Sequence, residues 1–456
     1  MRLTTLVAGA GMLCLVLACG NAFAAPTASL PEPRPLGREL PTFQVETEPP
    51  KLQAPADELT LRQALALALL HNPELAAFSW EVRVKEAEAL QAGLLPNPEM
   101  GIEMENLAGS GEFSGTESAE TTVTLSQLIE LGGKRGKRRA ASALEADLAG
   151  WDFETRRLDV LTATAKAFVA GLAAQERLAQ ADELAGLAER FFRTVSERVE
   201  AGKVSPVEQT RAQVPLAAAR VAQDRARLAL EAARKELAAL WGEETAGFER
   251  AVGSLERIAP VPPEEELASL LDQNPDVARW ETEEKQRRAR LDLERAKAIP
   301  DLTLFAGGRN LQESGDNAFV AGLSIPLPFF DRNQGGVAAA RAARSKARQA
   351  SRAARNQAVA SLAASYRDLS AAFTEARALR EQILPAAEQS FEAASFGYRE
   401  GKFGFLEVLD AQRTLFEVRG QYIEALAAYH QARVEVERLT GASLETDIVN
   451  HEQEKK

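Results

Sequence analysis

The stretch EMGIEMEN, residues 99–106, decides which kind of fold this chain can have. Its apolar side chains alternate with acidic ones, Met100, Ile102 and Met104 against Glu99, Glu103 and Glu105. A period of two is typical of a strand with one apolar and one polar face. The surrounding chain is rich in Ala, Leu, Glu and Arg, which favour helix. A mostly helical protein that carries such a strand needs an apolar surface on one side of it and water on the other.

The composition excludes several classes of protein. The 456 residues include 66 acidic and 54 basic side chains, a net charge of -12, whereas nucleic-acid binding needs a basic surface. No nucleic-acid partner is therefore expected. The three histidines, His71, His430 and His451, are widely separated and have neither catalytic nor metal-ligand spacing. We therefore expect no enzyme, no bound metal and no cofactor.

The first residues predict a signal peptide over 1–24. A basic residue precedes an apolar run at 6–18, and AFAA offers a cleavage site after Ala24. Both cysteines, Cys14 and Cys19, lie inside this segment. A transmembrane anchor, and cleavage before Cys19 with lipidation of that cysteine, stay open as alternatives. No later apolar run approaches the ~20 residues of a membrane helix, so entry into a membrane would require strands.

After a proline-rich extended arm at 25–58, the sequence repeats itself at an offset of about 200 residues. Four segments recur in the same order: HNPEL as QNPDV, LLPNPEMGIEM as AIPDLTLFAGG, VEAGKVSPVEQTRAQ as YREGKFGFLEVLDAQ, and LWG as LTG. This pattern predicts two tandem repeats, 59–247 and 248–441, followed by a tail at 442–456.

Each repeat reads helix, strand, strand, long helix, turn, helix, and the long helices are predicted over about 134–201 and 335–400. The strands are predicted at about 98–107 and 120–129, and again at about 301–309 and 318–327. A long helix of about 65 residues would measure ~100 Å, and the two shorter helices of the same repeat would match it when stacked end to end.

The strands are long enough to cross an outer membrane when tilted. A soluble, half-buried strand explains any one of them as well, but four in an exported chain favour a transmembrane sheet. Such a sheet must close, and single-chain barrels start at eight strands. Copies of the chain must then associate, two giving eight strands or three giving twelve. The apolar side of EMGIEMEN would face lipid, and Glu99, Glu103 and Glu105 would line a wet lumen.

These segments resemble a known family, the TolC-like outer-membrane efflux proteins. The resemblance rests on the NPEL helix start, the tandem repeat and the turns AGK…S…E…AQ and GK…EVLDAQ; LSQLIELGGKRGKR, 125–138, is similar to the heavy-metal (CzcC-like) branch. It implies a mostly α-helical homotrimer whose twelve-strand transmembrane β-barrel in the outer membrane continues into a long α-helical tunnel through the periplasm. Segments near 242–272 and beyond 441 would form a belt around this tunnel.

The same resemblance implies the partners and the sites of contact. The partners are outer-membrane lipid, a periplasmic adaptor and an inner-membrane pump of the resistance-nodulation-division type. The adaptor would meet the closed end of the tunnel at two turns, formed by Gly202, Val204 and Ser205 and by Gly401, Phe403 and Gly404.

Carboxylates beside the second turn are candidates for a constriction of the tunnel. Glu407 and Asp410 are three residues apart and share a helix face, and the family carries acids that narrow the tunnel mouth at the matching position. The first repeat offers only Glu208, because Arg211 stands at the second position. An ordinary surface pair of Asp410 with Arg413 or Arg380 stays open as the alternative.

The expected function is passive export of metal cations through an outer-membrane channel. Small organic toxins are the alternative substrate, and a periplasmic adaptor with a long hairpin is the alternative class of protein. The basic segment GGKRGKR lacks the spacing of a phosphate loop. It predicts a strand-to-helix turn with its basic cluster near the membrane border, or a solvated helix start.

Overall fold

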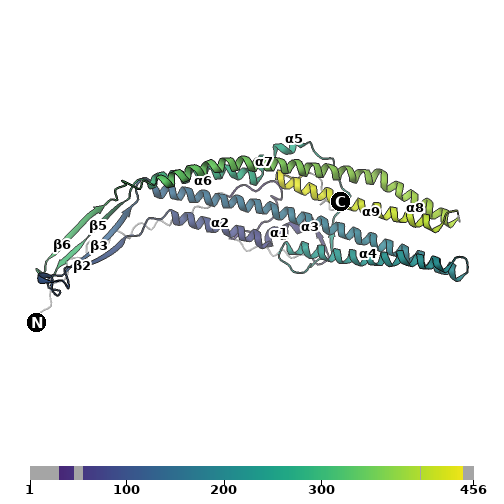
Figure 1. Cartoon of the computed structure of the whole chain (residues 1–456), viewed down its shortest axis with the longest axis horizontal. Coiled ribbons are helices and arrows are strands. Elements are labelled where there is room, and N and C mark those ends of the chain that lie inside the picture. Colours follow the sequence, from purple (N-terminus) through teal and green to yellow (C-terminus); the bar gives the residue numbers. More distant parts are fainter. Residues whose placement is uncertain (1–29, 46–54, 401, 445–456) are drawn as a thin grey trace, which may run out of the picture. The chain divides into compact units, whose positions relative to one another are not determined.

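The computed structural model describes residues 30–45, 55–400 and 402–444 (Figure 1). The predicted signal peptide with Cys14 and Cys19, the turn residue Gly401, and residues 445–456 of the predicted tail lie outside the described residues. The described chain divides into two compact units. The first unit holds residues 83–146 and 286–341, and the second holds 30–82, 147–285 and 342–444.

The first unit contains an antiparallel sheet of four strands in the order β2–β3–β5–β6. The strands overlap the four predicted segments: β2 Glu99–Glu105, β3 Glu120–Ile129, β5 Leu302–Leu311 and β6 Asn317–Ser324. The predicted extension of the last strand to about 327 is wrong, because Pro326 cannot donate to the ladder. Within the sheet, β2 and β6 are edge strands, each paired on one side only.

The strand register gives this sheet two different faces. Met100 lies opposite Leu125, Leu125 opposite Ala306, and the same face has no charged residue in any of the four strands. Its large apolar side chains are exposed: Met100, Ile102, Met104, Val123, Leu125, Leu304, Phe319 and Leu323. The opposite face carries all the charges of the strands: Glu99, Glu103, Glu105, Glu120 and Arg309.

The second unit is built from long helices. Four helices belong to both units, namely α2 (Pro73–Ala92), α3 (Lys134–Glu200), α6 (Pro275–Lys297) and α7 (Gln334–Ala378). Five lie wholly in the second unit: α1 (Leu61–His71), α4 (Pro206–Ala239), α5 (Glu264–Ser269), α8 (Leu384–Arg399) and α9 (Phe405–Thr440). The order helix, strand, strand, long helix, helix therefore occurs twice along the chain.

The helical run predicted over 335–400 is interrupted. A π-turn, Leu379–Ile383, separates α7 from α8, and the Leu384 amide donates to the Leu379 carbonyl, five residues back. Pro385 follows at once. A proline has no amide hydrogen and its ring crowds the carbonyl four residues before it, so a wider turn accommodates it.

The core of the second unit lies where the middle parts of the helices meet. The largest cluster packs α1, α3, α4 and α9 together with residues from the π-turn and from the segment that follows α4, among them Leu67, Phe168, Leu237, Trp241, Leu379 and Leu426. A short parallel pair, β1 (Glu58–Thr60) with β4 (Arg250–Val252), closes this region. The sequence analysis assigned no element at α1, β1, β4 or α5.

The described part of the predicted arm, residues 30–45, is fixed to the helices. The Arg34 amide donates to the Glu154 carboxylate at 2.8 Å, and the Arg157 guanidinium donates to the Leu36 carbonyl at 3.1 Å. The Leu36 amide donates to the Gly441 carbonyl at 3.0 Å, just beyond α9. Because Glu154 and Arg157 are buried and paired, these contacts give the arm a defined path.

Two asparagines make the same contact at two places in the second unit. The Asn72 amide group donates to the Leu240 carbonyl at 2.8 Å, where α2 begins and α4 ends. The Asn274 amide group donates to the Leu439 carbonyl at 2.8 Å, where α6 begins and α9 ends. Each asparagine oxygen also accepts from a backbone amide of the helix that it precedes. Each Asn-Pro pair thus joins the start of one helix to the end of another.

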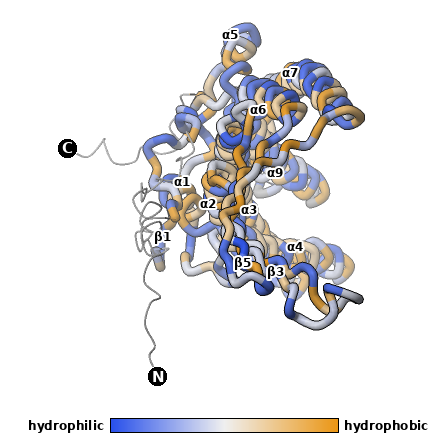
Figure 2. Tube along the Cα trace, turned by 90° about the vertical axis from the view of Figure 1, so that its left-hand side faces the viewer, coloured by the Kyte–Doolittle hydropathy of each residue, from blue (hydrophilic) through white to orange (hydrophobic). Residues whose placement is uncertain are grey.

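Among the residues that the structure describes, no helix is both long and apolar enough to cross a membrane. Figure 2 shows hydrophilic and hydrophobic residues interleaved along α7 rather than gathered in one hydrophobic run.

Candidate functional site

The first predicted turn connects α3 to α4. Gly202 has φ +68° and ends α3, with its amide donating to the Val199 carbonyl at 2.9 Å and the Lys203 amide donating to the Arg198 carbonyl at 2.9 Å. This pair of bonds is a Schellman motif, and glycine adopts the left-handed conformation without strain. Ser205 then caps α4, because its hydroxyl accepts from the Val207 amide.

The second predicted turn connects α8 to α9. The Lys402 amide donates to the Gly397 carbonyl at 2.8 Å, and a Cβ at Gly397 would lie 2.2 Å from the Phe403 ring. A side chain at Gly397 is therefore excluded by the ring. Gly404 precedes α9, and a Cβ there would lie 2.8 Å from a carboxylate oxygen of Glu407. Of the predicted turn residues, Gly202, Ser205, Phe403 and Gly404 are exposed, whereas Val204, expected to be exposed, is partly buried.

Both turns lie at the same end of the second unit (Figure 1). Arg198 from α3 donates to the Tyr398 hydroxyl from α8 at 2.8 Å, and its guanidinium lies 5.6 Å from the centre of that ring. Phe191 also packs against Tyr398, with ring centroids 6.2 Å apart. Further from the turns, Arg419 from α9 pairs with Glu183 of α3 and Glu388 of α8. These polar and aromatic contacts hold the two hairpins together near their ends.

A groove of about 690 Å³ lies between α3, α4 and α9 close to these turns. Its lining is mostly apolar, including Phe191, Val214, Pro215, Leu406, Leu409 and Phe416. Beside it, α4 carries an apolar stripe at intervals of seven residues, each side chain more than half exposed: Val207, Val214, Val221 and Leu228. A seven-residue repeat on one helix face is the pattern that packs against another helix.

The candidate carboxylates lie at the start of α9 and α4. Glu407 and Asp410 are exposed, and Glu208 is partly exposed in the first turn of α4. Among the described residues, no ion pair joins Asp410 to Arg413 or Arg380, so the structure does not contain the alternative surface pair. Both acids of α9 are accordingly available to solvent and ions.

The acids of the sheet contact a cation that the sequence analysis did not single out. Arg309 of β5 pairs with Glu105 at 3.1 Å and Glu120 at 2.8 Å, and donates to the Thr122 hydroxyl at 2.9 Å. Glu105, Glu103 and Glu99 lie on the same exposed face. Four acids and one arginine leave this face with a net charge of -3.

The basic segment after β3 forms the predicted strand-to-helix turn. Its cations are paired rather than solvated: Lys134 contacts Asp301 at 2.7 Å, and Arg138 contacts Glu130 at 2.6 Å. Arg138 also donates to the Ala92 carbonyl at 2.7 Å, at the end of α2. The hydrogen bonds that the Arg138 guanidinium donates to the Glu130 carboxylate raise the pKa of Arg138. The cluster therefore caps the carboxyl end of α2, where its positive charge interacts favourably with the negative end of the helix dipole.

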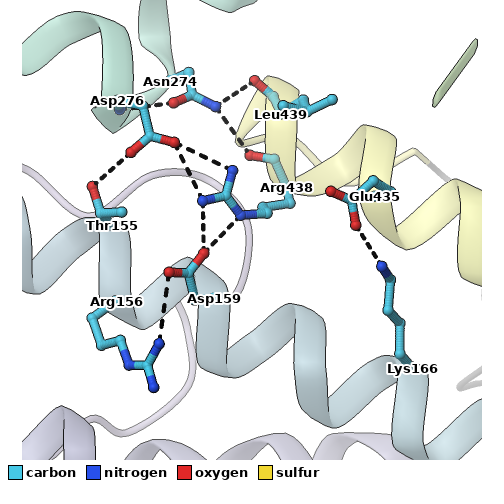
Figure 3. Close-up of polar contacts among 9 residues, drawn as sticks. All are labelled: Thr155, Arg156, Asp159, Lys166, Asn274, Asp276, Glu435, Arg438 and Leu439. Carbon is cyan, nitrogen blue, oxygen red and sulfur yellow. Dashed lines mark hydrogen bonds and ion pairs between the residues drawn. The ribbon is translucent and has the colours of Figure 1, made fainter. Parts of the chain in front are cut away.

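A polar cluster ties the start of α6 to α3 and α9 (Figure 3). Arg438 of α9 pairs with Asp159 of α3 at 2.7 Å and with Asp276 of α6 at 3.3 Å. Thr155 donates to the same Asp276. Burial by itself lowers the pKa of Arg438, but the two carboxylates outweigh it and the pKa is raised. The paired groups thus remain charged, and the ion pairs hold α3, α6 and α9 together at this point.

No cluster of the described residues brings together three His, Cys, Asp or Glu side chains that could hold a metal ion. His71 ends α1 directly before Asn72, and His430 is fully buried with its Nε2 beside the Leu255 carbonyl. Burial lowers the pKa of His430 to about 4, so this ring is neutral at physiological pH.

The chain thus combines a four-stranded sheet, uncharged on one face and acidic on the other, with long helices. The family model described as Outer membrane efflux protein matches residues 64–243 and 267–442. The chain belongs to this family and is an outer-membrane efflux protein. The family membership sets aside the alternative of a periplasmic adaptor.

Individual relatives agree with this assignment. The cobalt-zinc-cadmium resistance protein CzcC of Cupriavidus metallidurans is 35% identical over 386 residues, which cover 85% of this chain and 91% of that protein. The nickel-cobalt-cadmium resistance protein NccC of Alcaligenes xylosoxydans xylosoxydans is 29% identical over 298 residues, 65% of this chain and 66% of that protein. The predicted resemblance to the heavy-metal branch is confirmed.

A solved structure supports the fold. A membrane protein from Pseudomonas aeruginosa superposes with a TM-score of 0.72 at 20% identity, covering 94% of this chain and 99% of that one.

Proposed function

We propose that this chain is the outer-membrane channel of a tripartite efflux system, through which metal cations leave passively. The observation that carries the proposal is the two-faced sheet. One face is uncharged with exposed apolar side chains, as lipid requires, and the other has a net charge of -3, as a cation pathway requires.

Several copies of the chain are needed to complete such a sheet. The edge strands β2 and β6 each have one unpaired side, which a membrane does not tolerate. Three copies would supply twelve strands, the homotrimer that the family resemblance implies. The stripe Val207, Val214, Val221 and Leu228 on α4 supports association, because it offers each copy an apolar helix face for a neighbour.

We also propose that residues 59–247 and 248–441 are tandem repeats. The twin contacts of Asn72 with Leu240 and of Asn274 with Leu439 support this, since both residues of each pair occupy matching places in HNPEL/QNPDV and LWG/LTG. In the trimer the repeats would supply alternating hairpins to one tunnel. The segments near 242–272 and beyond 441 would form its belt.

The two turns are the proposed contact with the periplasmic adaptor. Ser205, Phe403 and Gly404 are exposed at the end of their hairpins and are held there by defined backbone bonds. Gly202 shapes the first turn, and Val204 beside it is partly buried. Gly401, which also belongs to this proposal, lies outside the described residues. An inner-membrane pump of the resistance-nodulation-division type would supply the energy through the adaptor.

The proposed cargo is divalent metal cations. The relatives CzcC and NccC are named for resistance to cobalt, cadmium, zinc and nickel. Small organic toxins remain the second candidate, favoured by the apolar groove between α3, α4 and α9. The two candidate cargoes differ in the side chains that they need at the tunnel mouth, acidic ones for metal cations and apolar ones for organic toxins.

Glu407, Asp410 and Glu208 are the proposed constriction. Three protomers would bring six carboxylates of α9 together, and repulsion among like charges favours binding of a cation. The purified channel in planar bilayers should prefer cations, and divalent ions should block it from the side of the turns. The double change Glu407→Gln with Asp410→Asn should weaken divalent block about tenfold, equivalent to about 1.4 kcal/mol.

The matched control removes two exposed acids of α5, Glu264→Gln with Glu265→Gln, at a distance from the turns. This control should leave selectivity and block unchanged. Survival of both properties in the Glu407 and Asp410 double variant would reduce these carboxylates to a solvated helix face.

A further inference from the structure

The alternation of β6 continues beyond the end of the strand. Within β6, Phe319 and Leu323 lie on the uncharged face. After Ser324 the segment IPLPFF, residues 325–330, keeps apolar residues at every odd position, and its large side chains are all exposed: Ile325 43%, Leu327 68%, Phe329 69% and Phe330 93%. We call residues 325–330 the aromatic turn.

Prolines explain why the ladder stops while the apolar residues continue. Pro326 and Pro328 have no amide hydrogen, so they cannot donate to the ladder of a neighbouring strand. The strand accordingly ends at Ser324, and the large apolar side chains that follow are left exposed.

Hydrogen bonds hold the aromatic turn in place. The Gln334 side chain donates to the Phe330 carbonyl at 3.1 Å, and the Arg332 guanidinium donates to the Pro328 carbonyl at 3.2 Å. Next to them, the Asn333 side chain donates to the Glu294 carboxylate of α6 at 2.7 Å. A Cβ at Gly336 would lie 2.3 Å from the Asn333 side-chain oxygen, so a side chain there would displace the Asn333 amide group from this anchor. The exposure of Phe330 is thus a built feature of the fold.

Other exposed apolar residues lie at the same end of the sheet. The register pairs Ile129 with Leu302 and Thr303 with Ser324, which places the end of β3, the start of β5 and the end of β6 together. Flanking these ends are Leu95, Leu131 and Ile299, each more than a third exposed. The helices α3 and α7 begin at this same end, after Leu131 and the aromatic turn.

We propose that the aromatic turn inserts into the lipid headgroup region at the end of the sheet where α3 and α7 begin, which is the periplasmic leaflet. The proposal rests on the proposed function, in which the sheet spans the outer membrane. Aromatic side chains gather at both borders of membrane barrels because their rings suit the interface between acyl chains and water. The continuity of the aromatic turn with the lipid-facing side of β6 favours lipid over a protein partner.

The chain offers a direct test, because its cysteines fall only in the predicted signal peptide. Single cysteines placed by Phe330→Cys, Leu323→Cys and Lys346→Cys would carry an environment-sensitive fluorophore in proteoliposomes. Lipids with a nitroxide near the headgroup should quench the label at position 330 more than lipids with a nitroxide near the chain end. The label at 323 should show the opposite order, and the label at 346, on α7, should show no quenching.

The outcomes separate the two proposals. Quenching at 323 without quenching at 330 would overturn the lipid contact of the aromatic turn and leave the channel proposal intact. No quenching at either position would remove the membrane sheet itself. Protection of position 330 only after a periplasmic protein is added would assign the surface to a protein partner and also overturn the proposal.

A second measurement needs no label. Phe329→Ser with Phe330→Ser should lower the amount of protein recovered in outer membranes several-fold, whereas Phe329→Leu with Phe330→Leu should restore it. Equal recovery of the serine variant and the unchanged chain would contradict the anchor.

Discussion

Val214→Lys combined with Val221→Lys is expected to abolish the trimer. Both valines lie in the middle of the exposed stripe on α4, each more than half exposed in the single chain. If the stripe packs against a neighbouring copy, each lysine is buried there without a partner, and an unpaired buried charge costs several kcal/mol. We expect association to weaken at least about a hundredfold, equivalent to about 2.7 kcal/mol. Native gels and light scattering in mild detergent would measure this.

The matched control keeps the same positions apolar. Val214→Leu with Val221→Leu should still form trimers, because the stripe remains continuous. Circular dichroism should show the same helix content for all variants, since the valines do not belong to the buried core. Trimers that persist in the lysine variant would show that α4 does not form the contact between copies.

Ser205→Arg combined with Gly404→Arg is expected to abolish efflux while trimers stay in the membrane. Both residues are exposed at the ends of their hairpins, so two bulky cations would lie where the adaptor is proposed to dock. Loss of the Ser205 cap costs about 1 kcal/mol, which is too little to unfold the chain. Cells with the cognate adaptor and pump should accumulate cadmium or zinc to the level of cells that lack this chain.

Ser205→Thr with Gly404→Ala provides the control for this experiment. Threonine preserves the cap, and the new Cβ at position 404 meets only the end of the mobile Glu407 side chain. Resistance should therefore be retained. Full metal resistance in the double arginine variant would exclude these turns as the docking site. If the unchanged chain gave cells resistance to organic toxins alone, the proposed cargo would be wrong.

The parts of this fold that local patterns determine were predictable. Alternation over about 98–107 and 301–309 predicted strands, and the register brings Met100, Ile102 and Leu304 to one face as expected, although Phe305 lies on the other. Gly202 ends α3 with a positive φ, a conformation that glycine adopts without strain, so the glycine by itself indicated where this helix ends. The family resemblance then supplied the class of protein, and the family model confirms it.

Other features depend on partners far along the chain. The basic segment was predicted as a strand-to-helix turn near the membrane border or as a solvated helix start, and its contacts with Asp301 and with the carbonyls that end α2 could not be predicted from the local pattern. Arg309 could have been noticed as the sole basic residue of the four strands, but its pairing with Glu120 joins β5 to β3, which are far apart in the sequence. The contacts of Tyr398 with Phe191 and of Gly397 with the Phe403 ring were not predicted, because such contacts produce no periodic pattern in the sequence. The π-turn is explained by Pro385, which the prediction of a helix over 335–400 did not take into account.

The twin asparagine contacts have a consequence for how such a chain can grow. At each junction, a side-chain amide bridges the carboxyl end of one helix and the amino end of another, with their dipoles running head to tail. At each junction two helices are joined end to end by an asparagine side chain, although the backbone does not run from one helix into the other. The backbone that follows the first helix can therefore form other structure without breaking the contact between the two helices. New segments inserted directly after Gly242 or Gly441 should therefore be tolerated. These two junctions are the positions at which this architecture could accept additional domains.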